Sequence, residues 1–251
     1  MSNSVKTHKM TIVSFTSWPK RIQYAGITIF SMLRQTHVPD LILLQLSKQE
    51  FPNLWKDLPI DLQYVCSYNH PRVQIRWHDD NTRAFKKVIP AIKEFRNTDA
   101  WILSVDDDII YDSTYIEYMV NEANMNPNVC CTPGFSKLGN GLFVHGCGMI
   151  YNTKWFKNDT IFSFNIDDVN HIIASDHWIT AALYTNGIQF RKLKNFLAHV
   201  TFLELENPLG NIYSTQAPFA KRTKYMINKF NEMNYNIKPL FDNIGVNYND
   251  S

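Results

Sequence analysis

The stretch WILSVDDDIIYD, residues 101–112, decides how this chain is read. An apolar run that is typical of a buried strand leads directly into Asp106, Asp107 and Asp108. Alternate side chains of an extended chain share a face, so Asp106 and Asp108 are predicted to point together and Asp107 away from them. Two converging carboxylates repel each other in a partly desolvated cleft unless a cation lies near, and hard oxygen ligands suit Mg²⁺ or Mn²⁺. The alternative is a solvated acidic turn before a helix, with Asp112 as its cap.

Strands and helices alternate around this motif. The βαβ rhythm predicts an α/β fold with a parallel sheet and helices on its faces, whose ligands bind beyond the carboxyl ends of the strands. The three aspartates begin where the fourth predicted strand ends. Strands are predicted at 10–15, 40–47, 72–78 and 100–105, and helices at 24–36 and 82–95, the second bent or restarted near Pro90.

Composition narrows the class of protein. A chain of 251 residues, 45% of them hydrophobic, is long enough to bury one substantial core. A net charge of +2 gives no basic footprint for nucleic acid. The four cysteines have no CxxC or metal-finger spacing, which favours a reducing compartment. The chain begins without an apolar signal segment, and no apolar run approaches the ~20 residues that span a bilayer. We therefore expect a cytoplasmic protein, with at most peripheral contact to the inner face of a membrane.

The strand that ends in Asp-X-Asp and leads to a helix resembles the DXD motif of GT-A glycosyltransferases. The wider run from FKKVIPAIKEF (85–95) to WILSVDDDIIYD is similar to a group of bacterial sugar transferases. This resemblance implies a single GT-A (Rossmann-like) domain with a mostly parallel central sheet. Its parts would be a nucleotide-sugar half at 10–112, an acceptor half at 113–215 and a helical C-terminal tail at 216–251. It also implies a nucleotide-diphosphate sugar donor and a Mn²⁺ or Mg²⁺ ion bridging the diphosphate.

The resemblance assigns the metal and the ribose to the aspartates. Asp108 would bind the metal directly, and Asp106 would contact the ribose or bind the metal through water. Asp107, the middle residue, is carried over as a further contact to the nucleotide sugar. His199, in FLAHVTF, is a candidate additional metal ligand, because some members of the family use a C-terminal histidine. The alternative for a single histidine is a structural role.

The loop FTSWPKRI (15–22) after the first strand holds further candidates for the donor site. Thr16 and Ser17 are placed to meet the nucleotide. Arg21 is a candidate to grip phosphate, because a guanidinium offers two parallel N–H groups. The alternative for Arg21 is packing on the surface of the loop.

Two more candidate donor contacts follow the third strand. By similarity Asp79 or Asp80, in WHDDN, would hydrogen-bond the base or the ribose, with a solvated turn as the alternative. Lys86 and Lys87 point in different directions on a helix, so one of them at most is expected to face phosphate. Lys86 is the candidate we prefer.

Glycines gather in GFSKLGNGLFVHGCGMIYN (134–152), which indicates a loop whose backbone a ligand approaches closely. By resemblance, Gly146 and Gly148 would form part of the floor beneath the transferred sugar. A plain turn into the strand that ends this stretch is the alternative. His145 is a candidate polar contact, although a lone histidine is more often structural.

Asp176 precedes the apolar helix that begins with HWITAALY. Its carboxylate suits a helix cap. By resemblance to inverting GT-A enzymes it is the general base, although the usual Glu-Asp pair is here Ser-Asp-His. His177 is the second candidate for that role.

Three tryptophans and the amphipathic stretch near the C-terminus could each have either a structural or a binding role. Trp101, Trp155 and Trp178 would either stack on sugar rings or lie in the core. The stretch 219–241 would either pack on its own domain or lie on an anionic membrane near a lipid-linked acceptor. In the membrane interpretation the residues beneath the headgroups would be Tyr225, Met226, Ile227 and Phe230.

These observations predict a metal-dependent glycosyltransferase of the hexosyltransferase type, acting on a glycan or glycolipid in polysaccharide biosynthesis. A nucleotidyltransferase is one rival, but it would usually need a glycine-rich basic loop near the N-terminus, and SFTSWPKRI has no glycine. A sugar-binding module without catalysis is the other.

Overall fold

The computed structural model describes residues 9–67, 71–133, 147–172, 175–203 and 219–241. Within these ranges the central sheet has five strands in the order β3-β2-β1-β4-β7. The first four are parallel to their neighbours, and β7 runs antiparallel to β4. The predicted α/β class with a mostly parallel sheet flanked by helices is confirmed. The strands are β1 (Met10–Thr16), β2 (Leu41–Ser47), β3 (Val73–His78), β4 (Ala100–Ser104) and β7 (Met149–Asn152).

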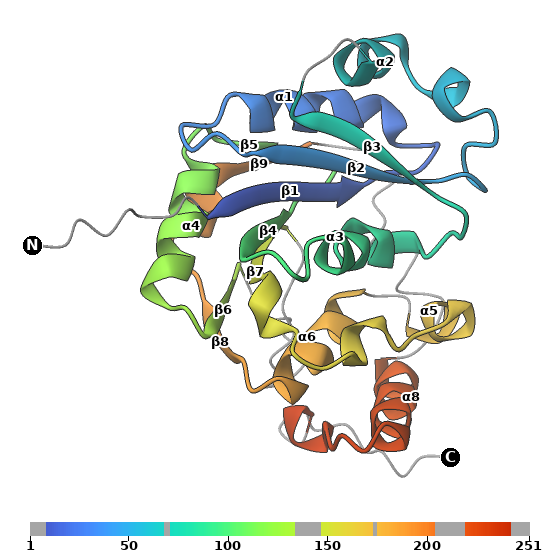
Figure 1. Ribbon diagram of the computed structural model, residues 1–251, viewed down its shortest axis with the longest axis vertical. Coiled ribbons are helices and arrows are strands. Elements are labelled where there is room, and N and C mark those ends of the chain that lie inside the picture. The colour runs from blue at the N-terminus through green and yellow to red at the C-terminus, as the bar shows by residue number, and fades with distance from the viewer. Residues whose placement is uncertain (1–8, 68–70, 134–146, 173–174, 204–218, 242–251) are drawn as a thin grey trace, which may run out of the picture.

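Helices cover both faces of this sheet. Figure 1 shows α1 and α2 on one side of the strands and α3, α5 and α6 toward the other, with α8 farther out on that side. Among the helices that the structure describes, none has the length and apolar character that crossing a membrane requires. The α-helices are α1 (Ala25–Leu33), α2 (Ile60–Ser67), α3 (Ile89–Glu94), α4 (Tyr115–Met125), α5 (Ile166–Ile172), α6 (Ser175–Thr185) and α8 (Phe219–Glu232).

Short 3-10 helices punctuate the connections. The predicted helix at 82–95 is divided into a 3-10 turn and α3, with Pro90 in the first turn of α3. A proline has no N–H to donate, so it is tolerated at a helix start and interrupts a helix elsewhere. The predicted restart near Pro90 is thus confirmed. The 3-10 helices are η1 (Ile22–Tyr24), η2 (Leu54–Asp57), η3 (Arg83–Lys87), η4 (Thr153–Trp155), η5 (Thr160–Phe162), η6 (Phe196–His199) and η7 (Lys238–Leu240).

Two small sheets accompany the central one, and the first of them joins the second half of the chain to the first. β5 (Ile109–Tyr111) pairs antiparallel with β9 (Val200–Phe202), and β6 (Val129–Thr132) pairs in parallel with β8 (Gln189–Lys192). β5 begins directly after the aspartates. The pairing with β9 therefore fixes the position of the aspartate turn against a segment about ninety residues later.

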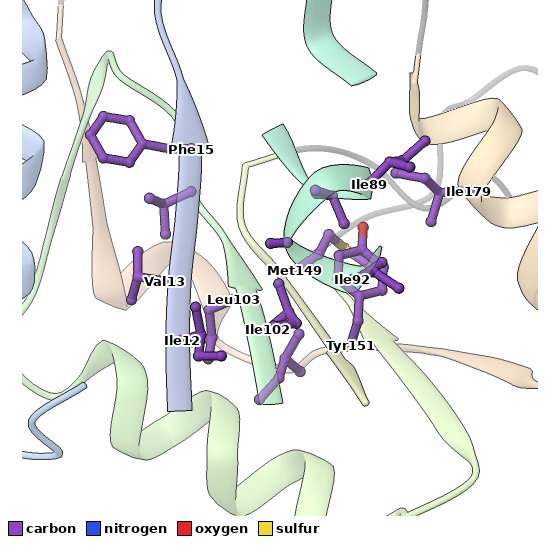
Figure 2. Packing of buried hydrophobic residues seen from close by; sticks show 14 of the residues in the cluster. Ile12, Val13, Phe15, Ile89, Ile92, Ile102, Leu103, Met149, Tyr151 and Ile179 are labelled. Atoms are coloured by element: carbon purple, nitrogen blue, oxygen red, sulfur yellow. The ribbon is translucent and has the colours of Figure 1, made fainter. Parts of the chain in front are cut away.

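The core lies on both faces of β1 and β4. Figure 2 shows Ile92 of α3, Tyr151 of β7 and Ile179 of α6 gathered on one side, while Val13 and Phe15 point to the other side of β1. All five side chains are at most 1% exposed. Burial of this kind contributes roughly 1.5–3 kcal/mol for each large apolar side chain.

The tryptophans named as candidate sugar platforms belong to this core. Trp101 and Trp155 make an edge-to-face contact, with ring centroids 6.0 Å apart. The indole of Trp178 is fully buried, and its N–H donates to the carbonyl of Ile161 at 3.0 Å. The sugar-stacking interpretation of these three residues is therefore wrong.

Helix α8 packs on its own domain. Met226 and Phe230 are at most 1% exposed, and the ring of Phe230 lies 4.8 Å from that of Trp178. The apolar face of α8 thus lies against α5 and, through Phe230, against Trp178 of α6. This corrects the membrane interpretation of the tail.

Candidate active site

The three aspartates do not continue the extended chain of β4. The strand ends at Ser104, and Asp107 and Asp108 lie in a tight turn before β5. One guanidinium nitrogen of Arg21, Nη2, contacts Asp107 at 2.6 Å and Asp108 at 2.7 Å. The predicted alternation, with Asp107 pointing away from its neighbours, is therefore wrong. The turn rotates Asp107 and Asp108 toward the same arginine.

Asp107 is an internal anchor of this turn. Its side chain is 7% exposed. One carboxylate oxygen accepts a hydrogen bond from the hydroxyl of Ser17 at 2.6 Å, and the other forms an ion pair with Arg21. Burial raises the pKa of Asp107 to about 7, against the opposing effects of Arg21 and Ser17. Both carboxylate oxygens of Asp107 have protein partners, which corrects its assignment as a nucleotide contact.

Arg21 is likewise a buried residue that stabilises the aspartate turn. Its side chain is 5% exposed, and its charge is directed to the two aspartates. Both ion pairs use Nη2, and the Nε of Arg21 is buried without a hydrogen-bond partner among the described residues, so the guanidinium faces the inside of the aspartate turn and not an open site where it could grip phosphate. The neighbouring candidate Thr16 donates its hydroxyl to the carbonyl of Gln45 at 2.7 Å. This loop therefore shapes the aspartate turn from inside the fold.

Asp106 faces a different set of partners. Its carboxylate contacts the ammonium of Lys87, and its backbone N–H donates to the hydroxyl of Tyr111 at 2.8 Å. The same hydroxyl donates to the carbonyl of Cys147 at 2.9 Å. Tyr111 thus links the aspartate turn to the segment before β7. Sequence reasoning overlooked Tyr111, although the alternation within β5 predicts that it points inward like Ile109.

Asp176 lies in the first turn of α6, where its side chain is half-buried. Burial lowers the pKa of Lys87, the carboxylates of Asp106 and Asp176 raise it, and the balance is upward. Burial raises the pKa of the Cys147 thiol to about 11, and Asp106, Asp176 and Asp108 raise it further. Asp106 and Asp176 therefore both shift the pKa values of Lys87 and Cys147, and Asp108 shifts that of Cys147.

The donor atoms fit a hard divalent cation. Asp106 and Asp108 are 29% and 28% exposed at their side chains. Each has one carboxylate oxygen without a hydrogen-bond or ion-pair partner among the described residues. Within those residues no group of three His, Cys, Asp or Glu side chains is arranged to hold a metal. Mg²⁺ usually binds through one or two carboxylates and takes its remaining ligands from water and substrate phosphates, so the oxygen donors of Asp106 and Asp108 are of the kind that such an ion uses.

His199 does not belong to this group. Its carbonyl accepts the N–H of Asp112, while the carbonyl of Asp108 accepts the N–H of Leu203. These two hydrogen bonds lie at opposite ends of the β5–β9 pair. Asp108 and Asp112 are four residues apart along the extended chain, which is about 13 Å at about 3.3 Å per residue. The ring of His199 stacks on Tyr118 at 4.3 Å. The prediction of a shared metal with Asp108 is therefore wrong, and the structural alternative describes His199.

The two adjacent lysines, Lys86 and Lys87, contact different parts of the protein. The ammonium of Lys86 contacts Glu50 at 3.0 Å and Asn81 at 2.5 Å. Lys87, and not Lys86, faces the aspartates. This corrects the choice between them, which the sequence could not make because it does not show how η3 is oriented. Asp79 lies beyond the end of β3, 87% exposed, where Lys48 holds it at 2.7 Å and lowers its pKa.

Of the two glycines that were predicted to lie beneath the sugar, only Gly148 is among the described residues. Gly148 has a φ of +142°, and a Cβ at this position would lie 2.3 Å from the hydroxyl of Tyr115. Backbone conformation and the close tyrosine therefore require this glycine. Gly146 and His145 lie outside the described residues.

A cavity of about 650 Å³ lies elsewhere, between α1 and the β5–β9 sheet. Its walls include Ile27 and Phe30 of α1 and Ile110 of β5, but not Asp106, Asp108 or Asp176. We place the candidate site at the carboxylates and not in this cavity, because the chemically competent side chains gather there.

No family model matches the sequence, and no curated protein matches it. Among solved structures, the crystal structure of S. aureus TarS matches 93% of this chain with a TM-score of 0.51 and 13% sequence identity. The chain is similar in fold to TarS. At this identity the likeness shows the fold alone. This chain spans 45% of the length of TarS.

Proposed function

We propose that this protein is a glycosyltransferase that moves a sugar from a nucleotide-diphosphate sugar to a glycan or glycolipid. One observation carries the proposal: Asp106 and Asp108 lie directly after the parallel strand β4, at the edge of the sheet where α/β folds bind ligands, and keep 29% and 28% of their side chains exposed. Transfer from an activated sugar needs a site for the diphosphate and a base for the acceptor. The Asp-X-Asp motif that resembles GT-A glycosyltransferases, together with the mostly parallel sheet, supports the same reaction.

Asp106 and Asp108 would hold Mn²⁺ or Mg²⁺ in the donor site. When bound, the cation supplies positive charge opposite the negative charge that develops on the diphosphate leaving group. The protein keeps the two carboxylates in place through Arg21 and Lys87. Asp79, exposed beyond the end of β3, remains a predicted contact to the base or the ribose.

Asp176 would act as the general base. A hydroxyl is a weak nucleophile until its proton is removed, and a positioned carboxylate contributes typically about 10²- to 10⁴-fold to such a step. Asp176 lies in the acceptor half of the chain, in the first turn of α6. Direct attack by the activated hydroxyl inverts the anomeric carbon. The product is therefore expected to have the anomeric configuration opposite to the donor, which NMR of the product measures; retention would contradict the role of Asp176.

Donor binding tests the proposal directly. Thermal unfolding should be measured with a panel of nucleotide sugars, with and without Mn²⁺, for the wild type, Asp108→Asn and Asp99→Asn. Asp99 makes a matched control, because it precedes the same strand at the opposite edge and its side chain is 61% exposed. A ligand at 100 times its Kd stabilises the folded state by about 2.7 kcal/mol.

We expect one nucleotide sugar with Mn²⁺ to raise the melting temperature of the wild type and of Asp99→Asn, and to leave Asp108→Asn unchanged. Absence of a shift for every nucleotide sugar would contradict the proposed function. A nucleotidyltransferase would instead release pyrophosphate from a nucleoside triphosphate and a sugar phosphate.

A further inference from the structure

Tyr111, the last residue of β5, connects the aspartate turn to the segment before β7 through its hydroxyl group. The residue is 2% exposed. The backbone N–H of Asp106 donates to this hydroxyl at 2.8 Å, and the hydroxyl donates to the carbonyl of Cys147 at 2.9 Å. An N–H group can only donate and a carbonyl can only accept, so the direction of both hydrogen bonds is fixed. One buried hydroxyl therefore bridges two backbone segments that are distant along the chain.

The backbone of Asp106 is also held at its carbonyl. Thr28, a fully buried residue of α1, donates its hydroxyl to this carbonyl at 3.2 Å. The N–H and the carbonyl of Asp106 thus have side-chain partners from two different elements, β5 and α1. The carboxylate of the same residue contacts Lys87 and keeps 29% of its side chain exposed. With its backbone fixed, this carboxylate can move only by changing its own side-chain rotamer.

We propose that Tyr111 is a positioning residue for the cation site, whose hydroxyl fixes the backbone of Asp106 so that the carboxylates of Asp106 and Asp108 are in place before a divalent cation binds. This inference rests on the proposed function. Tyr111 is buried, so it acts through Asp106 and does not contact the cation. Groups that orient metal ligands from behind typically change metal affinity or activity by about 10- to 100-fold when they are removed.

Tyr111→Phe tests the role, because it removes the hydroxyl and keeps the ring, which lies 4.5 Å from the ring of Tyr115. Mn²⁺ is titrated alone and then with the nucleotide sugar that stabilises the wild type, well below the melting temperature. Electron paramagnetic resonance measures the free ion. We expect the Kd for Mn²⁺ to rise by about 10- to 100-fold in Tyr111→Phe.

Tyr115 provides a control at the same place in the fold. Its hydroxyl is buried beside Tyr111 and has no hydrogen-bond partner among the described residues. Tyr115→Phe therefore removes a hydroxyl without removing a hydrogen bond. It should leave the Kd for Mn²⁺ near that of the wild type, and it should not lower the melting temperature.

Tyr225 provides a control for the loss of a tyrosine hydrogen bond in another part of the fold. Its hydroxyl donates to Asp168 at 2.6 Å, where α8 packs against α5. Tyr225→Phe should lower the melting temperature and leave the Kd for Mn²⁺ unchanged. This control separates a general loss of stability from the loss of positioning that we expect in Tyr111→Phe.

If Tyr111→Phe does not fold, Thr28→Val takes its place. Valine has a similar shape and removes the hydroxyl that holds the carbonyl of Asp106. The Kd for Mn²⁺ should rise in this variant too, because the same carboxylate loses a backbone anchor. An unchanged Kd would contradict the proposal.

Two further results would overturn the proposal. A Kd for Mn²⁺ in Tyr111→Phe equal to that of the wild type would leave Tyr111 with a role in stability alone. An equally raised Kd in Tyr115→Phe would show that the packing of the two rings, and not the hydrogen bonds of Tyr111, supports the site. Absence of Mn²⁺ binding in the wild type would contradict the cation site of the proposed function itself, so the two failures are distinguishable.

Discussion

The three consecutive aspartates have different surroundings, and the surroundings decide what each side chain contributes. Asp107 is enclosed by Ser17 and Arg21, whereas Asp106 and Asp108 keep more than a quarter of their side chains exposed. The sequence predicted an acidic group at the end of a strand. It could not predict which aspartate turns inward, because that depends on a tight turn and on an arginine 86 residues earlier.

Asp107→Asn should therefore act on stability more than Asp108→Asn. Asparagine keeps the size of the side chain but removes the carboxylate that pairs with buried Arg21 and Ser17. Loss of a buried charge-assisted contact costs about 1–3 kcal/mol, whereas a partly exposed pair contributes about 1 kcal/mol or less. Urea unfolding measures both values. Equal free energies of unfolding for the two variants would contradict the anchor role of Asp107.

His78 gives the fold a predictable response to pH. Burial and the nearby Lys86 ammonium lower its pKa from 6.5, against the opposing carboxylates of Asp79 and Glu94. The neutral ring, whose Nε2 lies 2.7 Å from the Oε1 of Gln45, is favoured in the folded state. Its contribution to stability is present above the unfolded pKa of about 6.5 and is lost as pH falls toward the lower folded pKa.

We expect the free energy of unfolding to fall less between pH 7 and pH 5 in His78→Gln than in the wild type. His171→Gln, at an exposed histidine on α5, is the control and should follow the wild-type profile. Identical slopes for His78→Gln and the wild type would exclude this role for His78.

At the scale of elements, the sequence predicted the main strands within one residue at each end. Apolar runs bounded by polar turns define β1, β2, β3 and β4, and Pro90 marks the start of α3. The β5–β9 and β6–β8 pairs were not predicted as pairs. Their strands are three or four residues long, too short for a periodic signal, and their partners lie about 60 to 90 residues away.

Asp168 is the polar anchor of helix α8. It is fully buried in α5, accepts the hydroxyl of Tyr225 at 2.6 Å and lies 3.3 Å from the ammonium of Lys229. Asp168→Ala leaves these groups unpaired, so we expect a loss of about 2–4 kcal/mol in the free energy of unfolding. Limited proteolysis should also cut α8 faster. Asp167→Ala, at the exposed neighbour, is the control, and equal behaviour of the two variants would contradict the anchor.

At the scale of the whole molecule, the candidate site depends on the meeting of two halves of the chain. The rule for ligands at the carboxyl ends of parallel strands predicts a donor site at the aspartates, and the resemblance to GT-A enzymes predicts the roles of Asp108 and Asp176; both stay predictions. Neither indicates that Lys87 contacts Asp106 or that Tyr111 joins the aspartate turn to the segment before β7. The residues in these contacts are 5 to 36 positions apart along the chain. Such tertiary contacts leave no periodic signal in the sequence.

Transfer by Asp176→Asn tests the central claim most directly. Asp176 is the second residue of α6 and not its N-cap, and asparagine keeps its size while removing a charge that contributes about 0.3–1 kcal/mol in the first turn of a helix, so the variant separates a helix-stabilising role from a catalytic one. Asp167→Asn, in the first turn of α5, is the matched control. We predict that Asp176→Asn melts near the wild-type temperature and binds the donor with Mn²⁺, yet transfers sugar about 10²- to 10⁴-fold more slowly, while Asp167→Asn transfers normally. Normal transfer by Asp176→Asn would contradict the account.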